Sequence, residues 1–483
     1  MLLAVVVTLA LCAAAAGVGA LLHDDGPGHP DEWDERVAPL VSFVERTRGL
    51  KFRHPVAVYF LPVDQYTRAI VGTSKAESPT DEPVVPDEEA SQADADVAAF
   101  QRALGFVEGP QDLDEVNERL AGDGTLAYYD FTRKLVNVRG TEVTVGVETT
   151  LVHELTHALQ DQHFDLEARH QVADSEQAAV LRAVLEGDAM TVQAAYTETL
   201  TEAQRRRLDE ENDTGLAEAE TDLADVPTAL QAAQAIPYYL GRPYVALAQT
   251  TGPGQLDPSR LDRLMGDLPD VTAAVFTPGS ELEEQDDVTA PDLGDGEPFL
   301  QDTLGAFSLF VLLAERIDPL VAMSAVDGWR GDTLVAAKVA ADDLDGDGPK
   351  GDVMCIAARI RMADQGESTQ LVDALSIWAQ AMPSEARAEV SAEGSIVDLR
   401  SCDPGEEARG SRTGGALDAL VYPGGRLDLT AAFVGQGMAL DRAACVAGEV
   451  VQQLSREELV ASEPDPAVVD KVQQLVAAAT LDC

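Results

Sequence analysis

The stretch LVHELTHALQDQHF, Leu151–Phe164, is the most informative part of this chain of 483 residues for both fold and function. Within it, His153 and His157 are four residues apart, so on an α-helix both side chains point the same way. Glu154 lies about 100° further round the same helix. Two neutral imidazoles on one helix face are a common half of a zinc site, and the neighbouring glutamate is placed to act as a general base.

The residues around this motif favour a buried helix. Apolar side chains recur at helical spacing and predict a helix from 145 to 163. The chain contains seven histidines, and four of them fall between His153 and His170. The competing interpretation is a chance match on a solvent-exposed helix.

A second long helix is predicted from 175 to 202, with LEGDAM at its centre, Leu185–Met190. Its apolar positions make it mostly buried, and a buried glutamate needs a partner. A zinc ion would provide that partner for Glu186. The rival third ligand is His163, which lies six residues after His157. On a continuous helix, however, His163 points about 240° away from His157.

The HELTH motif followed by Glu-Gly-Asp-Ala resembles the gluzincin superfamily of zinc metallopeptidases, which pair HExxH with a downstream glutamate. The run from a predicted hairpin through HELTHALQDQHF to EGDA is also similar to an exported, poorly characterised bacterial family of this type. That likeness covers residues 31 to about 330. The resemblance implies a zinc cofactor held by His153, His157 and Glu186, with Glu154 as general base.

Two features depart from the gluzincin pattern. The gap of 28 residues between His157 and Glu186 is longer than in many gluzincins. Met190 stands at a position where an acidic residue is common, so the usual hydrogen-bond partner of a zinc ligand is in question. His163 and Asp188 are candidates for such supporting contacts.

Catalysis also needs a donor for the oxyanion that develops on the substrate carbonyl. The candidates are tyrosines in or near the segment Ile236–Arg242. The competing role for each is core packing. The candidates are Tyr238 and Tyr239, with Tyr244 and Tyr196 also considered.

A hairpin is predicted just before the metal helix, with strands at 126–131 and 135–138. In zinc peptidases generally, an exposed strand beside the metal helix pairs with extended substrate backbone. The hairpin therefore suggests a peptide or protein substrate. An ordinary core hairpin is the equal alternative.

Charge and cysteines indicate the environment. The formal charge is −51, from 85 acidic and 34 basic residues, which disfavours nucleic acid and anionic membranes as partners. The apolar residues 1–22 predict a signal peptide or membrane anchor and hence an exported protein. Four cysteines in the last third suit two disulfides in an oxidising compartment. Of three possible pairings, the two local ones are favoured: Cys355–Cys402 and Cys445–Cys483.

The remaining segments carry weaker signals. Residues 74–94 are acidic and Pro-rich and predict a flexible insertion. The acidic run at 343–348 matches the first half of a calcium-binding loop, but Met354 replaces the glutamate at the twelfth position, which favours a plain acidic turn.

The expected fold class is α+β. A mainly helical, zincin-like metallopeptidase domain with a small sheet is expected at 23–331, after the leader at 1–22. A small α+β subdomain at 332–406, a linker at 407–427 and a disulfide-stapled helical unit at 428–483 follow. The expected function is an extracytoplasmic zinc peptidase. The alternative is a catalytically inactive binding or assembly protein of the cell envelope on the same scaffold.

Overall fold

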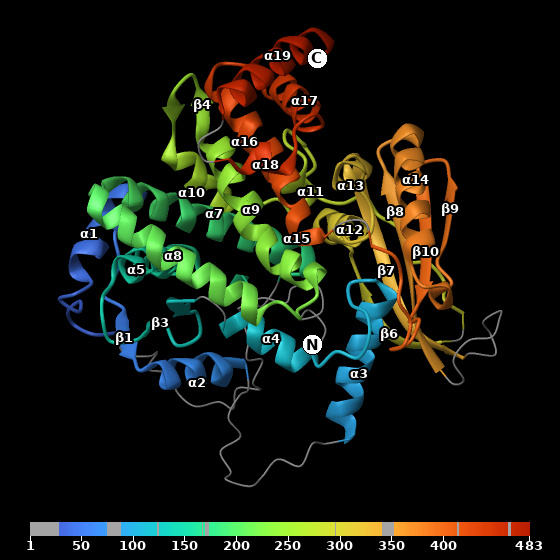
Figure 1. Cartoon of the computed structure of the whole chain (residues 1–483), viewed down its shortest axis with the longest axis horizontal. Coiled ribbons are helices and arrows are strands. Elements are labelled where there is room, and N and C mark those ends of the chain that lie inside the picture. The colour runs from blue at the N-terminus through green and yellow to red at the C-terminus, as the bar shows by residue number, and fades with distance from the viewer. Residues whose placement is uncertain are drawn as a thin grey trace.

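A computed structural model of the chain describes residues 29–74, 88–122, 125–166, 168–169, 173–294, 296–340, 352–412, 415–461 and 465–483. It is an α+β structure, as the sequence predicts. Figure 1 shows three parts: long helices with a small sheet on the left, a larger sheet on the right and a helical tail above them.

The small sheet has three strands in the order β1-β3-β2. The predicted hairpin is confirmed, because β2 and β3 pair antiparallel, whereas β1 pairs parallel with β3. Lys134 makes the tight turn of the hairpin with a φ of 54°. The strands are β1 (Ala57–Leu61), β2 (Ala127–Asp130) and β3 (Leu135–Arg139).

The helix that carries HELTH packs against this sheet. Leu151 and Leu155 are fully buried in a cluster with Val136 and Val138 of β3. The helix begins where the Thr144 hydroxyl accepts a hydrogen bond from the backbone N–H of Val147, an N-cap. The helices of this part are α1 (Ala38–Arg48), α2 (Val63–Ser74), α4 (Leu113–Gly122) and the HELTH helix α5 (Val145–Phe164), whereas α3 (Glu88–Ala103) lies against the larger sheet (Figure 1).

The second predicted helix is also present, and it packs on α5. It starts at a capping box, in which Asp174 and Gln177 satisfy each other's backbone N–H groups. The charged segment that follows α7 is one continuous helix, which begins at a capping box of its own. These helices are α7 (Ser175–Thr199), α8 (Glu202–Asp222) and α9 (Thr228–Gln249).

Short elements connect α9 to the larger sheet. The strongly apolar segment at 304–317 contains the buried helix α12, in which Phe307 and Phe310 are buried. The elements between α9 and the first strand of that sheet are β4 (Thr250–Gly252), β5 (Gln255–Leu256), α10 (Pro258–Gly266) and α11 (Ala273–Phe276), and α12 (Gly305–Ala314) and α13 (Pro319–Val326) lie between its first two strands.

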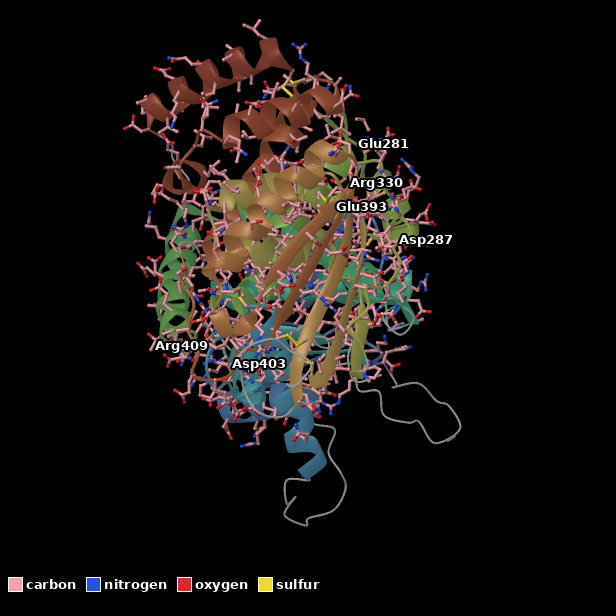
Figure 2. All side chains as sticks on the ribbon, turned by 90° about the vertical axis from the view of Figure 1, so that its right-hand side faces the viewer. Glu281, Asp287, Arg330, Glu393, Asp403 and Arg409 are labelled. Carbon is pink, nitrogen blue, oxygen red and sulfur yellow. A yellow bond between two sulfur atoms is a disulfide. The ribbon has the colours of Figure 1, made fainter. Side chains whose placement is uncertain are left out.

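The larger sheet has five antiparallel strands in the order β6-β7-β8-β10-β9. The predicted Cys355–Cys402 disulfide is confirmed and joins directly opposed residues of β8 and β10. Asp403, just past β10 (Figure 2), pairs with Arg102 of α3 at 2.7 Å. The elements are β6 (Glu297–Asp302), β7 (Trp329–Ala340), β8 (Asp352–Met362), α14 (Gln365–Ala381), β9 (Glu389–Glu393) and β10 (Ile396–Cys402).

The expected boundary at 331/332 falls inside β7, and β6, which joins the same sheet, precedes it. One buried cluster runs from α3 through α7, α9 and α12 to the large sheet and α16. The regions expected to be separate domains therefore share a core. Sequence composition could not show this, because two helices separate β6 from the next strand of the sheet, β7, in the chain.

The expected linker at 407–427 is also corrected. Its second half is helical, and Leu420 and Leu427 are fully buried. Gly424 of this segment allows close packing, because a Cβ there would lie 3.1 Å from the Tyr239 carbonyl oxygen. The Cys445–Cys483 disulfide is confirmed and joins α17 to the chain end. The tail helices are α15 (Ala416–Ala419), α16 (Val421–Gly435), α17 (Leu440–Val451), α18 (Arg456–Val460) and α19 (Pro466–Asp482).

Three expectations fall partly or wholly outside the described residues. These are the leader at 1–22, most of the acidic insertion at 74–94 and the acidic run at 343–348. Of the insertion, residues from Glu88 onward are described and begin α3. Among the helices that the structure describes, none has the length and apolar character needed to cross a bilayer.

Candidate metal centre

Three side chains from α5 and α7 converge between the two helices. His153, His157 and Glu186 each offer one ligand atom, and these atoms lie within 4.8 Å of one another. The Nε2 atoms of the two histidines are 3.0 Å apart, and the Glu186 Oε2 atom is 3.1 Å from His153 Nε2 and 3.4 Å from His157 Nε2. Tetrahedral Zn²⁺ with bonds of about 2.0–2.1 Å needs ligand separations of roughly 3.3 Å. The three observed separations match that requirement.

The hydrogen bonds around His157 fix which ring nitrogen is free for a metal. The Gln160 amide nitrogen donates to the Leu185 carbonyl at 3.1 Å and to Asp188 at 2.9 Å. The Gln160 oxygen therefore faces His157 Nδ1, at 2.9 Å, and can only accept a hydrogen bond from the Nδ1–H group. Neutral His157 consequently carries its lone pair on Nε2, which is the atom in the cluster.

His153 is held in the same way from the other helix. Its Nδ1 lies 3.0 Å from the side-chain oxygen of Gln193, on α7. Two imidazoles held by Nδ1–H bonds present two Nε2 lone pairs to each other at 3.0 Å. Lone pairs at that distance repel unless a proton or a metal cation lies between them. The geometry therefore suits a bound cation.

The electrostatics of the cluster also favour positive charge. Burial lowers the pKa of His157, but the Glu186 carboxylate outweighs it, and the pKa rises to about 9. Burial raises the pKa of Glu186, but His157 and the hydrogen bonds from both histidines bring it well below its usual value. The carboxylate is therefore ionised and ready to bind a cation.

A charged network lies behind Gln160. Asp188, predicted as a supporting residue, accepts from Gln160 and from Arg48 Nε, the latter at 2.7 Å. Arg48 also lies 2.7 Å from Asp262. Asp188 thus acts on His157 through Gln160 rather than on a ligand directly.

Sequence reasoning missed the two glutamines that hold the histidines. The signal was present in the helical spacing, because Gln160 is three residues after His157 on α5. Gln193 is seven residues after Glu186, two turns along the same face of α7.

Glu154, the predicted base, lies beside the cluster and is 9% exposed. Its Oε2 atom accepts a hydrogen bond from the backbone N–H of Tyr129, on β2, at 2.7 Å. Burial raises the pKa of Glu154, and the nearby positive charge of His153 and His157 lowers it by a smaller amount. A group of the hairpin thus orients this carboxylate, whereas substrate pairing along β2 stays a prediction.

A close crossing of α7 and α9 places Tyr238. A Cβ on Gly187 would overlap the Gly241 backbone, and one on Gly241 would overlap the Ala183 carbonyl. The two backbones can touch only because both residues are glycine. Tyr238 lies one turn before Gly241, and its pKa is raised by burial and by the negative charge of Glu186. Tyr238 therefore lies within electrostatic range of the cluster.

The other candidates are not brought into the cluster. Tyr239 is 42% exposed, and its backbone packs against α16. Tyr196 donates to Glu148 at 3.1 Å, and burial alone raises the pKa of Tyr244 to about 12. His163 Nε2 lies 2.8 Å from the carbonyl of Lys51, consistent with its expected direction away from His157.

Comparisons with known proteins add no assignment: no protein-family model, no curated protein and no solved structure matches the chain. The function is therefore argued from the cluster and its surroundings alone.

Proposed function

We propose that this protein is a zinc-dependent peptidase of the gluzincin type, with His153, His157 and Glu186 as metal ligands and Glu154 as general base. Two imidazoles and one carboxylate are the donor set of a catalytic zinc site that keeps a fourth position open. The observation that carries the proposal is the pair of oriented Nε2 atoms 3.0 Å apart, with the Glu186 carboxylate at 3.1 and 3.4 Å.

The residues of the chain have distinct parts in the reaction. A bound zinc ion would polarise the substrate carbonyl and acidify a water molecule. Glu154 accepts the proton from that water and delivers it to the departing amine as the peptide C–N bond breaks. The Tyr129 amide holds one carboxylate oxygen of Glu154, which leaves Oε1 to carry the proton.

Tyr238 is the candidate donor to the oxyanion. Its pKa is raised, so its hydroxyl keeps its proton and can donate a hydrogen bond to the negative charge that develops on the carbonyl oxygen. Glu186 contributes to that shift, which is consistent with a hydroxyl near the ligands.

The setting that we propose is outside the cytoplasm. Two disulfides are typical of oxidising compartments. The strong negative charge suits a soluble exposed surface and disfavours nucleic acid as a partner.

Metal analysis combined with a peptide-library digest tests the proposal. The purified protein is expected to contain one zinc per chain and to cleave peptides. Glu154→Gln should keep the zinc and lose cleavage, and Glu186→Ala should lose zinc. Glu148→Gln on the same helix, outside the cluster, is the matched control and should keep both.

The outcomes separate the alternatives. Stoichiometric zinc without cleavage in any form would support the inactive binding protein on the same scaffold. Absence of zinc from the wild-type protein under metal-replete conditions would contradict the proposal.

A further inference from the structure

Arg182 lies beside the candidate metal centre. It is on α7, one turn before Glu186, and its guanidinium carbon is 5.9 Å from the centroid of the Tyr238 ring. Its Nη2 donates to the Gln234 carbonyl at 3.4 Å, and its positive charge lowers the pKa of Tyr238, against the larger effect of burial. The same helix that supplies the third ligand therefore brings a positive charge to the centre.

The groups that contact the Arg182 guanidinium, the Gln234 carbonyl and the Tyr238 ring, are neutral, whereas the fully buried arginines of the described ranges pair with carboxylates. Within the described ranges, no carboxylate oxygen lies within the 4.0 Å ion-pair distance of its guanidinium. The buried arginines, in contrast, each have a carboxylate partner at 2.6–3.1 Å: Arg48 with Asp188, Arg102 with Asp403, Arg316 with Glu108 and Arg426 with Asp327.

This difference has a physical consequence. The chain has a formal charge of −51, yet the contacts described for the Arg182 guanidinium are to neutral groups. A half-buried guanidinium is partly desolvated, and a charge-assisted bond to a carboxylate stabilises it more than bonds to neutral oxygens do. The missing counter-ion can be supplied by a ligand.

We propose that Arg182 binds a carboxylate of the substrate. The inference rests on the proposed peptidase function and names the substrate class. The planar guanidinium presents paired N–H groups that match the two oxygens of a carboxylate. In a peptide, that carboxylate is either the C-terminal group or the side chain of Asp or Glu.

The position of Arg182 limits how far the carboxylate lies from the cleaved bond. Four helical residues advance about 6 Å along α7 from Arg182 to Glu186. An extended peptide advances about 3.3–3.6 Å per residue. The bound carboxylate therefore lies within a few residues of the carbonyl that reacts.

Retention of peptides by the immobilised protein tests this inference without relying on turnover. The Glu154→Gln protein, as purified and after zinc loading, is offered equal amounts of two random hexapeptide libraries, one with free C-termini and one amidated. A second pair of amidated libraries carries Asp and Glu or, in their place, Asn and Gln. Mass spectrometry gives the retained ratio for each pair.

The expected result is retention of a carboxylate form by about tenfold or more over its neutral counterpart, which corresponds to about 1.4 kcal/mol. The pair that shows the preference identifies the source of the carboxylate. Adding Arg182→Met should abolish the preference without changing zinc content. Arg182→Lys should keep part of it, because the charge remains and the paired geometry is lost. Arg456→Met, in the exposed tail helix α18, is the control and should leave the ratio unchanged.

Two results would overturn the inference: equal retention in both library pairs, or a preference that survives Arg182→Met. Both can be distinguished from failure of the peptidase proposal, which is read from zinc content and from cleavage by the wild-type protein. A protein that binds zinc and cleaves peptides, but has no carboxylate preference, keeps its proposed function and loses this substrate class.

Discussion

At the scale of single residues, the candidate centre depends on two glutamines as much as on its ligands. Gln160 can orient His157 in only one way, because its own amide nitrogen is committed to the Leu185 carbonyl and to Asp188. Gln193 meets the corresponding nitrogen of His153. Side chains of this kind fix the ring and tautomer of a ligand and raise metal affinity.

We therefore expect Gln160→Leu to weaken zinc binding by about 10–100-fold while leaving all three ligands in place. The substitution removes the acceptor that holds the His157 Nδ1–H and leaves Asp188 with one donor fewer. Competition with a chromogenic chelator measures the zinc dissociation constant. Gln162→Leu, two residues further on the same helix, is the control, because the hydrogen bonds of Gln162 within the described residues go to the backbone of Arg53 and His54. Equal affinities in the two variants would show that Gln160 has no such role.

The two histidines could be predicted from spacing alone, whereas the approach of Glu186 could not. His153 and His157 are on one helix, so their approach follows from helical geometry. The approach of Glu186 depends on how α7 packs on α5, and in the sequence it was indicated by its buried setting and by the resemblance of its motif to that of gluzincins. Tyr238 and Tyr239 are adjacent in the chain, and only the position of the α7–α9 crossing distinguishes them.

At the scale of elements, that crossing is the feature that brings α9 to the centre. Gly187 and Gly241 allow the backbones of α7 and α9 to touch. Gly187 lies in a predicted helix, where glycine is unfavourable by about 1 kcal/mol relative to alanine, whereas no helix was predicted around Gly241. Such glycines indicate close packing, but they do not indicate which helix approaches.

Gly187→Ala is therefore expected to destabilise the protein, by about 1–3 kcal/mol, because the added methyl group forces the helices apart. It should also lower zinc affinity, since Glu186 is the adjacent residue. Urea denaturation followed by circular dichroism measures the first effect. Gly448→Ala, in α17, adds a methyl group to open space and should leave stability unchanged or raise it by up to about 1 kcal/mol. Similar stability of the Gly187→Ala protein and wild type would contradict this account of the crossing.

At the scale of the whole molecule, one core joins regions that the sequence suggested were separate. A group of buried acidic residues lies where α7, α11, α12 and β7 meet. Burial raises the pKa of Glu176 to about 8 and that of Asp332 to about 6. Asp332 accepts from the backbone N–H groups at the start of α12, at 2.7 and 2.9 Å. Composition and periodicity predicted the elements, but not this junction, because its members are up to 156 residues apart, from Glu176 to Asp332.

These raised pKa values give stability a defined dependence on pH. Each acid holds its proton to a higher pH in the folded protein than in the unfolded chain, so the folded state binds more protons in that range. For Glu176 the range runs from about 4.3, its unfolded value, to about 8. The free energy of unfolding therefore falls as pH rises through this range.

Glu176→Gln should flatten this dependence, by an amount on the order of 4 kcal/mol between pH 5 and pH 8. Urea denaturation at a series of pH values, at constant ionic strength, measures it. Glu202→Gln, at the exposed start of α8, is the control and should preserve the wild-type slope. A wild-type protein whose unfolding free energy rises steadily from pH 5 to pH 8 would contradict the assignment of a raised pKa to Glu176.

The central claim is that two helices bring two imidazoles and one carboxylate to a single zinc ion. X-ray absorption at the zinc edge of the purified, zinc-loaded protein tests it most directly. The account predicts one zinc per chain with two imidazole nitrogens at about 2.0–2.1 Å and oxygen ligands completing the shell, and loss of the bound zinc in Glu186→Ala. A zinc shell without imidazole, or a Glu186→Ala protein that keeps the wild-type zinc content and spectrum, would contradict it.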